Sequence, residues 1–249
     1  MIQAVFFDIG GTLHTVTSDE QVRARFIKEL RKRLEKQDIR IPVDDDVFSS
    51  LLHQNAERYK HHVEQTLWEW PADRIWDEFY LADFDVGRDK LAPISEELSF
   101  LYNDMRVVNT ARPHVKEVMD ALKKRNLRLG IISNTISTTF SPYFLRECGI
   151  YDAMEMIILS SEVGFRKPSH EIFRLAIDKL EIEKDAFCYV GDTLSRDVLG
   201  CKNAGIGLSI QIDNPAIYHR DEGFLCSGLE PDYKITDLLE IIPIIDKII

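Results

Sequence analysis

The chain has 249 residues, of which 45% are hydrophobic and 29% are charged. This length allows one large domain, or a domain with a sizeable insertion, around a buried core. The composition excludes a mainly disordered, collagen-like or coiled-coil chain. The 42 acidic and 31 basic side chains give a net charge of −11, so the surface repels a phosphate backbone and we expect no nucleic-acid partner.

The cysteines and the chain ends bear on the cellular compartment. Cys148, Cys188, Cys201 and Cys226 are widely spaced, which favours reduced thiols over a disulfide framework or a zinc site. The first apolar run is not preceded by basic residues, so we expect no signal peptide. The apolar tail at 238–249 is interrupted and too short to span a bilayer. We therefore expect a cytoplasmic protein with no membrane partner, and we predict no oligomeric state.

The first predicted element is a buried strand, Ala4–Phe7, which ends at Asp8 and runs into the glycine pair Gly10 and Gly11. The stretch 16–106 that follows has helical patterns and almost no strand signal. Ser18 and Gln21 have the spacing of a capping box, which predicts the start of a helix.

Four amphipathic helices are predicted within this stretch. The apolar residues of 22–34 fall on one helical face, and further helices are predicted over 47–63, from Pro71 onward and over 94–101. Because the stretch follows the first strand, we expect it to lie above the carboxyl edge of a sheet, where open α/β sheets bind ligands.

The rest of the chain alternates strands with helices. Apolar runs at 127–132, 156–159, 186–190 and 207–212 predict buried strands, and 232–235 predicts a weaker one. Helical periods lie between them, at 115–122 and 172–180. Strands that are apolar throughout, separated by amphipathic helices, predict an α/β fold with helices on both faces of a parallel sheet.

A polar group of a different kind follows each of four strands. These groups are the Asp8 carboxylate, the Ser133 hydroxyl, the Lys167 ammonium and the carboxylate pair Asp192 and Asp197. Carboxyl ends of parallel strands lie side by side, so we expect the groups to converge on one site. The acids can hold a hard cation, for which Mg²⁺ is the expected ion, while the lysine and serine hold a phosphate.

The chain strongly resembles the haloacid dehalogenase (HAD) superfamily. The resemblance rests on four motifs in order, at 7–13 (Phe-Asp-Ile-Gly-Gly-Thr-Leu), 131–134 (Ile-Ile-Ser-Asn), 165–168 (Phe-Arg-Lys-Pro) and 190–197, and on Gly200, Ala204 and Gly205. It implies a Rossmann-like core formed by 1–15 and 107–249, with 16–106 as an inserted all-helical cap in the C1 position, which selects the substrate. It also implies a Mg²⁺-dependent phosphatase that acts on a small phosphorylated metabolite through an aspartyl-phosphate intermediate.

The resemblance also assigns roles to individual residues. Asp8 matches the nucleophile, whose use divides hydrolysis into phosphorylation and dephosphorylation of the enzyme, and Ser133 and Lys167 complete the expected catalytic set. The expected phosphate-binding residues are Ser133, Asn134, Lys167 and Gly11, with the backbone N–H after Ser133 taking part. The expected metal site comprises Asp8, the Gly10 backbone carbonyl, Asp192 and Asp197.

Gly10 departs from the family pattern. Phosphatases of this superfamily normally have a second aspartate at this position, which protonates the leaving oxygen and then activates water. General acid–base catalysis contributes about 10²–10⁴-fold, or roughly 3–5 kcal/mol of the barrier, so its loss should slow turnover. Glycine keeps the backbone carbonyl, so we expect metal binding to be intact.

Several other titratable residues are candidates for a functional role. His14 is the nearest titratable residue that could replace the missing acid, but a histidine without a catalytic role is the favoured interpretation. His53, Glu57, His61 and His62 have helical spacing, and we expect a solvated helix face rather than a metal site.

Five aromatic residues and one arginine could be either structural residues or substrate-binding residues. Trp68, Trp70, Trp76, Phe79 and Tyr80 are expected to form the cap core rather than a substrate platform. Arg112 could reach a substrate anion, although a surface loop is the default expectation.

Three alternatives to a phosphatase remain open. Gly10 is compatible with a non-catalytic or regulatory protein that binds a phosphorylated ligand. A dehalogenase also lacks the second aspartate, but Asp192 is a metal-binding acid that metal-independent dehalogenases typically lack. A phosphonatase lacks the aspartate too, but no motif identifies its cap lysine here.

Overall fold

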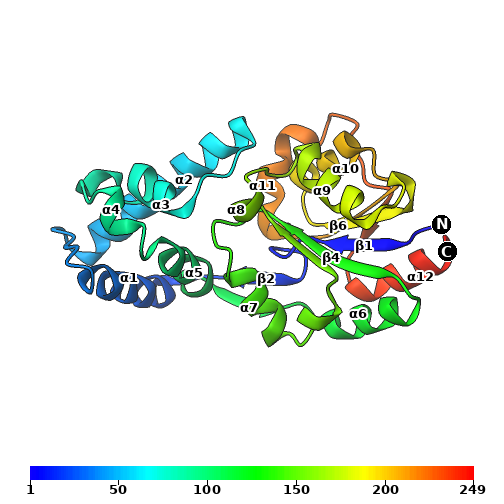
Figure 1. Ribbon diagram of the computed structural model, residues 1–249, viewed down its shortest axis with the longest axis horizontal. Helices are drawn as coiled ribbons and strands as arrows, with labels where there is room; N and C mark the ends of the chain where they lie inside the picture. Colours follow the sequence, from blue (N-terminus) through cyan, green and yellow to red (C-terminus); the bar gives the residue numbers. More distant parts are fainter.

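A computed structural model describes all 249 residues. Its centre is a six-stranded parallel sheet in the order β5-β4-β1-β6-β7-β8, which confirms the predicted α/β fold (Figure 1). The strands are β1 (Ala4–Phe7), β4 (Arg128–Ser133), β5 (Met156–Leu159), β6 (Phe187–Gly191), β7 (Leu208–Ile212) and β8 (Tyr233–Ile235).

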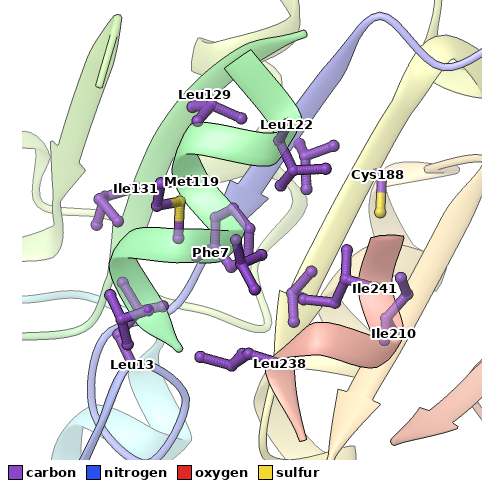
Figure 2. Packing of buried hydrophobic residues seen from close by; sticks show 14 of the residues in the cluster. Phe7, Leu13, Met119, Leu122, Leu129, Ile131, Cys188, Ile210, Leu238 and Ile241 are labelled. Carbon is purple, nitrogen blue, oxygen red and sulfur yellow. The ribbon is translucent and has the colours of Figure 1, made fainter. Parts of the chain in front are cut away.

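Helices cover both faces of this sheet because successive strand residues point to opposite sides. In β1, Val5 and Phe7 pack on one face, and Ala4 and Phe6 pack on the other. The first face is covered by α6 (Val115–Lys124), α7 (Phe140–Glu147) and α12 (Ile241–Asp246), and the second by α9 (His170–Leu180) and α10 (Leu199–Ala204). Figure 2 shows the first face, where Met119 and Leu122 of α6 lie over Phe7.

The helical stretch forms a second body with a hydrophobic cluster of its own, and we call it the cap (Figure 1, left). Its helices are α1 (Glu20–Glu35), α2 (Asp45–Thr66), α3 (Ala72–Ile75), α4 (Arg88–Leu91) and α5 (Ser95–Met105). The predicted apolar face of the first helix is buried, from Val22 to Leu34. No helix of the protein is both long and apolar enough to cross a membrane.

Three local predictions for helix starts and cores were wrong. The α1 helix is capped by Asp19, whose carboxylate accepts from the Val22 N–H, and not by Ser18. Proline is favoured at the first position of a helix, which predicts a helix start at Pro168, but α9 begins at His170 with Ser169 as its cap. Trp68 lies outside the cap core and packs against Phe165 of the core, with ring centroids 5.1 Å apart.

Two short strands join the cap to the core, and the sequence analysis missed both. Strand β2 (His14–Thr17) pairs antiparallel with β3 (Val108–Ala111), and His14 lies opposite Ala111. The predicted boundary after residue 15 therefore falls inside a strand. The chain enters and leaves the cap through one two-stranded ribbon.

Two buried or half-buried glutamates of the cap make further contacts with the core. Glu69, which is 3% exposed, forms an ion pair with Arg166 and accepts a hydrogen bond from the Ser160 hydroxyl at 2.7 Å. Glu96 of α5 accepts from the Thr138 and Thr139 N–H groups at 3.0 Å, near the start of α7. These contacts hold the cap over the carboxyl edge of the sheet.

Candidate active site

The polar residues at the strand ends lie together at the carboxyl edge of the sheet. Asp8, Ser133 and Asp192 follow or end the three adjacent strands β1, β4 and β6, and each side chain is at least 90% buried. They line a cavity of about 430 Å³ that also borders Gly10 and Asn134. The sequence-predicted residues are therefore brought to one place.

Lys167 lies at the centre of the charged cluster. Its ammonium lies 2.9 Å from an Asp8 oxygen and 2.7 Å from an Asp197 oxygen, and it donates to the Tyr189 hydroxyl at 2.7 Å. Burial lowers the pKa of Lys167, but the charges of Asp197 and Asp8 outweigh this effect and raise it above the usual value. The lysine therefore stays charged beside the Asp8 carboxylate.

Both carboxylate oxygens of Asp197 are occupied by neighbouring protein groups. One oxygen accepts from Lys167, and the other accepts from the Thr193 hydroxyl at 2.6 Å and the Thr193 N–H at 3.0 Å. Burial raises the pKa of Asp197, but the charges of Lys167 and then Arg196 overcome it and hold the pKa at about 2. The resemblance implied that Asp197 is a metal ligand or supports one. These bonds make Asp197 the residue that positions Lys167, and its contact with a metal stays a prediction.

Asp192 is only half satisfied. Its Oδ2 accepts from the Asn214 amide at 2.7 Å, whereas its Oδ1 is buried and has no hydrogen-bond partner. Burial, and then the charges of Asp197 and Asp8, raise the pKa of Asp192 to about 7. An unpaired buried carboxylate oxygen is costly unless a cation meets it.

The carboxylates of Asp8, Asp192 and Asp197 offer oxygen atoms within 4.8 Å of one another, and they are the one such acidic cluster in the protein. Mg²⁺ prefers hard oxygen ligands and commonly uses one or two carboxylates. The unpaired Oδ1 of Asp192 therefore fits a divalent cation held at this cluster.

Gly11 has a structural role that was not predicted. Its backbone has φ +83°, and a Cβ atom there would lie 1.8 Å from Asp192 Oδ2, so only glycine fits. Its N–H donates to the His14 carbonyl and its carbonyl accepts from Arg112. Both backbone groups of Gly11 therefore have partners within the protein, and its predicted contact with a phosphate stays a prediction.

Arg112 likewise binds backbone groups of the protein itself. Its guanidinium donates to the carbonyls of Gly11 and Asp213, at 2.7 and 2.9 Å for Nη2. Arg112 therefore ties the glycine turn after β1 to the loop after β7, and it does not line the cavity.

Ser133 and Asn134 divide the tasks that were predicted for them. The Ser133 hydroxyl lines the cavity. The Asn134 side chain binds the Lys167 backbone, because it accepts from the Lys167 N–H at 2.9 Å and donates to the Lys167 carbonyl at 3.0 Å. Only the Asn134 backbone N–H is left to meet a phosphate.

Gly10 leaves the position of the expected second acid open. A Cβ atom at Gly10 would meet nothing within 4 Å, so no neighbour replaces the missing side chain. His14 lines the same cavity, with its ring edge-on to Phe144 at 4.8 Å. Burial lowers the pKa of His14. A lower pKa makes an imidazole a weaker proton store at neutral pH, which favours the interpretation of His14 as a residue without a catalytic role.

The remaining candidates on the second cap helix do not converge on a site. His53, Glu57 and His61 are exposed, and His62 packs its ring against Trp70 at 4.8 Å. The predicted solvated face describes all but His62, which covers the aromatic cluster of the cap.

Two residues of the site were missed from the sequence. Tyr189 bridges Lys167 and the Ile132 carbonyl, and Asn214 holds Asp192. A tyrosine within an otherwise apolar strand needs a partner for its hydroxyl, and Asn214 follows a fifth strand, β7, so both carried a weak signal.

Comparison with known proteins decides the family. A family model described as haloacid dehalogenase-like hydrolase matches residues 2–205. The chain belongs to this family. The match confirms the resemblance inferred from the sequence.

Two curated relatives of this hydrolase span most of its length. Glyceraldehyde 3-phosphate phosphatase of Methanothermobacter thermautotrophicus is 26% identical over 212 residues, covering 83% of this chain and 84% of that protein. N-acylneuraminate-9-phosphatase of Rattus norvegicus is 24% identical over 249 residues, covering 99% and 95%.

Solved structures share the fold of the hydrolase. A 2-haloacid dehalogenase from Pseudomonas syringae superposes with a TM-score of 0.67 at 20% identity, and both chains are covered in full. A HAD phosphatase from Thermococcus onnurineus gives a TM-score of 0.61 at 23% identity, with 98% of each chain covered. Because one is a dehalogenase and the other a phosphatase, the fold does not separate the two activities.

Proposed function

We propose that this hydrolase is a Mg²⁺-dependent phosphatase that cleaves small phosphate monoesters through a phosphorylated Asp8. The observation that carries the proposal is the pairing of Asp8 with Lys167 at 2.9 Å, beside the unpaired Oδ1 of Asp192. The names of the curated relatives, both phosphatases, support the same reaction.

Asp8, Asp192 and the Gly10 carbonyl are the groups proposed to hold Mg²⁺. When bound, the ion neutralises phosphate charge and so allows a carboxylate to approach it. Asp197 keeps Lys167 in place between the two acids. Asn214 fixes one oxygen of Asp192 and leaves the other free.

Asp8 is the proposed nucleophile. One of its oxygens forms a bond to phosphorus while the bond from phosphorus to the ester oxygen breaks, and the alcohol leaves with the electron pair. Water then attacks the phosphorus of the acyl phosphate, which releases inorganic phosphate and restores the carboxylate. Lys167, Ser133 and the Asn134 N–H are placed to stabilise the phosphate charge during both steps.

Gly10 limits the first step. The departing alkoxide needs a proton, and no acidic side chain lies at the position next to Asp8 from which the family normally supplies it. Water must then protonate the leaving group, so esters with good leaving groups should react fastest. The cap is proposed to choose among substrates, because its hinge residues Asn103 and Arg106 line the same cavity.

The test is release of inorganic phosphate from para-nitrophenyl phosphate with added Mg²⁺. The wild-type protein should turn over, and Asp8→Asn should lose at least about 10³-fold in kcat, because the amide is not a nucleophile. The matched control, Asp152→Asn, changes an exposed aspartate and should react like the wild type. Equal rates for Asp8→Asn and the wild type would refute the proposal.

A second candidate function is favoured by Gly10 alone. A protein that binds Mg²⁺ and a phosphorylated ligand without turnover would need the charged cluster but not the acid. If a broad panel of phosphorylated metabolites binds with Mg²⁺ and none phosphorylates Asp8, this function replaces the first. Trapping of phosphate on Asp8 excludes it.

A further inference from the structure

Three arginines line the active-site cavity, and two of them have no partner of any kind. The third, Arg106, lies over the Tyr102 ring at 4.5 Å. Arg196 and Arg220 line the cavity that contains Asp8 and Asp192, and neither forms an ion pair or a side-chain hydrogen bond. Arg196 is half-buried, whereas Arg220 lies at the rim and reaches solvent. We call this pair the arginine wall.

Other arginines that are not freely solvated have visible partners. Arg128 pairs with Glu155, Arg166 with Glu69, and Arg112 donates to backbone carbonyls. Arg58 and Arg146 lie over aromatic rings at 5.7 and 3.9 Å. The unpaired state of the arginine wall is thus unusual in a protein whose net charge of −11 offers many carboxylates.

The fold places the backbones of the two arginines side by side. Arg196 lies on a π-helical turn, Leu194–Val198, and Arg220 lies on the short helix α11 (Tyr218–Asp221). Asp221, which is 5% exposed, accepts from the Leu194 and Ser195 N–H groups at 2.7 and 3.0 Å. Asp221 therefore fastens α11 to the turn and keeps Arg220 beside Arg196.

The proximity has an electrostatic cost. Partial desolvation, and then the positive charge of Arg196, lower the pKa of Arg220. A guanidinium does not lose its proton in proteins, so the two groups repel each other instead. A bound anion would relieve this repulsion with charge-assisted hydrogen bonds.

The arginine wall also lines a second cavity, of about 570 Å³, between the core and helix α2 of the cap. Lys60, Arg166 and Lys167 line it as well, but these three already pair with acids of the protein. Glu64 is its single acidic lining residue, is exposed, and forms no ion pair. Burial lowers the pKa of Arg196, but the charges of Asp192, Asp197 and Asp8 outweigh this effect and raise it. These acids act from a distance, because no carboxylate forms an ion pair with either guanidinium of the arginine wall.

We propose that Arg196 and Arg220 bind a second anionic group of the substrate, so that the enzyme takes phosphate esters that also carry a carboxylate or another phosphate. This inference rests on the proposed phosphatase function. The reacting phosphate lies against Asp8, where Lys167, Ser133 and the Asn134 N–H meet it. The distal anion lies against the arginine wall, toward the second cavity.

The experiment uses two matched pairs of probes. The first pair is 3-phosphoglycerate and glycerol 3-phosphate, and the second is fructose 1,6-bisphosphate and fructose 6-phosphate. Binding is measured by calorimetry with Mg²⁺ on the Asp8→Asn variant, which does not depend on turnover. The wild type is assayed with the same probes and with para-nitrophenyl phosphate.

The proposal predicts that the probe with the second anion binds at least about tenfold more tightly in one pair or both. In Arg220→Gln, KM for that probe should rise about 10–100-fold while kcat changes little. Para-nitrophenyl phosphate and the singly charged probes should be unaffected. Arg25→Gln, an exposed arginine of α1, is the control for the lost charge.

Two results would overturn the inference without touching the proposed function. One is equal binding, or no binding, of both members of each pair. The other is an equal loss for para-nitrophenyl phosphate and the doubly charged probes in Arg220→Gln, which would place the arginine on the reacting phosphate. Failure of the wild type on para-nitrophenyl phosphate would instead count against the phosphatase function.

Discussion

The strand-end cluster and the arginine wall line the same cavity, but they differ in whether their charged groups have partners within the protein. The Lys167 ammonium has three partners within 3 Å, Asp8, Asp197 and Tyr189, although the nearby Asp192 Oδ1 is unpaired. Arg196 and Arg220 have no such partner. The first region is organised before any ligand arrives, whereas the second is completed only by one.

This difference predicts separate roles: the strand-end cluster carries out the reaction, and the arginine wall discriminates between substrates. Preorganised charges stabilise the reacting groups without a cost of rearrangement during the reaction. Unpaired charges give binding energy that depends on the ligand, and this dependence is what distinguishes one substrate from another. Variants in the first region should therefore change stability and kcat, and variants in the second should change KM.

The largest effect is expected for Lys167→Met. Removing the ammonium leaves Asp8 and Asp197 buried without their partner, which typically costs about 3–5 kcal/mol in the free energy of unfolding. Phosphate release should also fall by at least about 10³-fold, because the phosphate charge is no longer balanced. Urea unfolding and the phosphate assay measure the two effects. Lys202→Met, at an exposed lysine, should change neither by more than about 0.5 kcal/mol.

Gly10→Asp should act on the chemistry alone. The position is open, so the aspartate fits, and it should raise kcat for esters with poor leaving groups by about 10²-fold. Rates on para-nitrophenyl phosphate should rise less, because its leaving group needs little help. Gly10→Ala is the control for backbone effects, and an identical rate for both variants would refute the assignment of slow turnover to the missing acid.

Asp192→Asn tests which oxygen meets the metal. The unpaired Oδ1 becomes part of a neutral amide, so Mg²⁺ affinity of the otherwise unchanged chain should fall by about 10–100-fold. Calorimetric titration with Mg²⁺ alone measures this. Asn214→Ala, which frees the other oxygen, should reduce affinity less. If Asn214→Ala were the more damaging change, the metal would be held through positioning rather than by the charge of Asp192.

The smallest effect is expected for Glu69→Gln, outside both regions. The change leaves Arg166 half-buried opposite a neutral group and should cost about 1.5–3 kcal/mol in unfolding free energy. Glu78→Gln, in the surface pair with Arg74, should cost no more than about 0.5 kcal/mol. Limited proteolysis should cut the 67–70 segment faster in Glu69→Gln, and an unchanged cleavage rate would mean that this contact does not hold the cap.

Local patterns predicted the strand-end cluster well for a physical reason. Buried parallel strands are apolar throughout, so Asp8 and Asp192 stand out at their ends, and adjacency in the sheet brings them together. The ribbon of β2 and β3 lacked this signal, because Val16 and Val108 are exposed and neither strand faces a core. The predicted helix cap, Ser18, is one residue away from the actual cap, Asp19. No local feature of the sequence distinguishes these two residues as caps.

The arginine wall could not be predicted from the sequence. Arg196 and Arg220 lie 24 positions apart in the chain and meet only because Asp221 ties their two turns together. A lone arginine in a sequence is expected to be solvated or paired. Its lack of a partner is a tertiary property, which appears only when every neighbour has been placed.

The two glycines after Asp8 are adjacent but differ in what mutation can do to them. At Gly11 any side chain would collide with Asp192, so we expect every substitution there to disrupt the site. At Gly10 the space is empty, and two of the four glycine codons become aspartate codons by a single base change. Where the Gly10 codon is one of these two, a single base change introduces the aspartate, and a library randomised at position 10 samples that change directly.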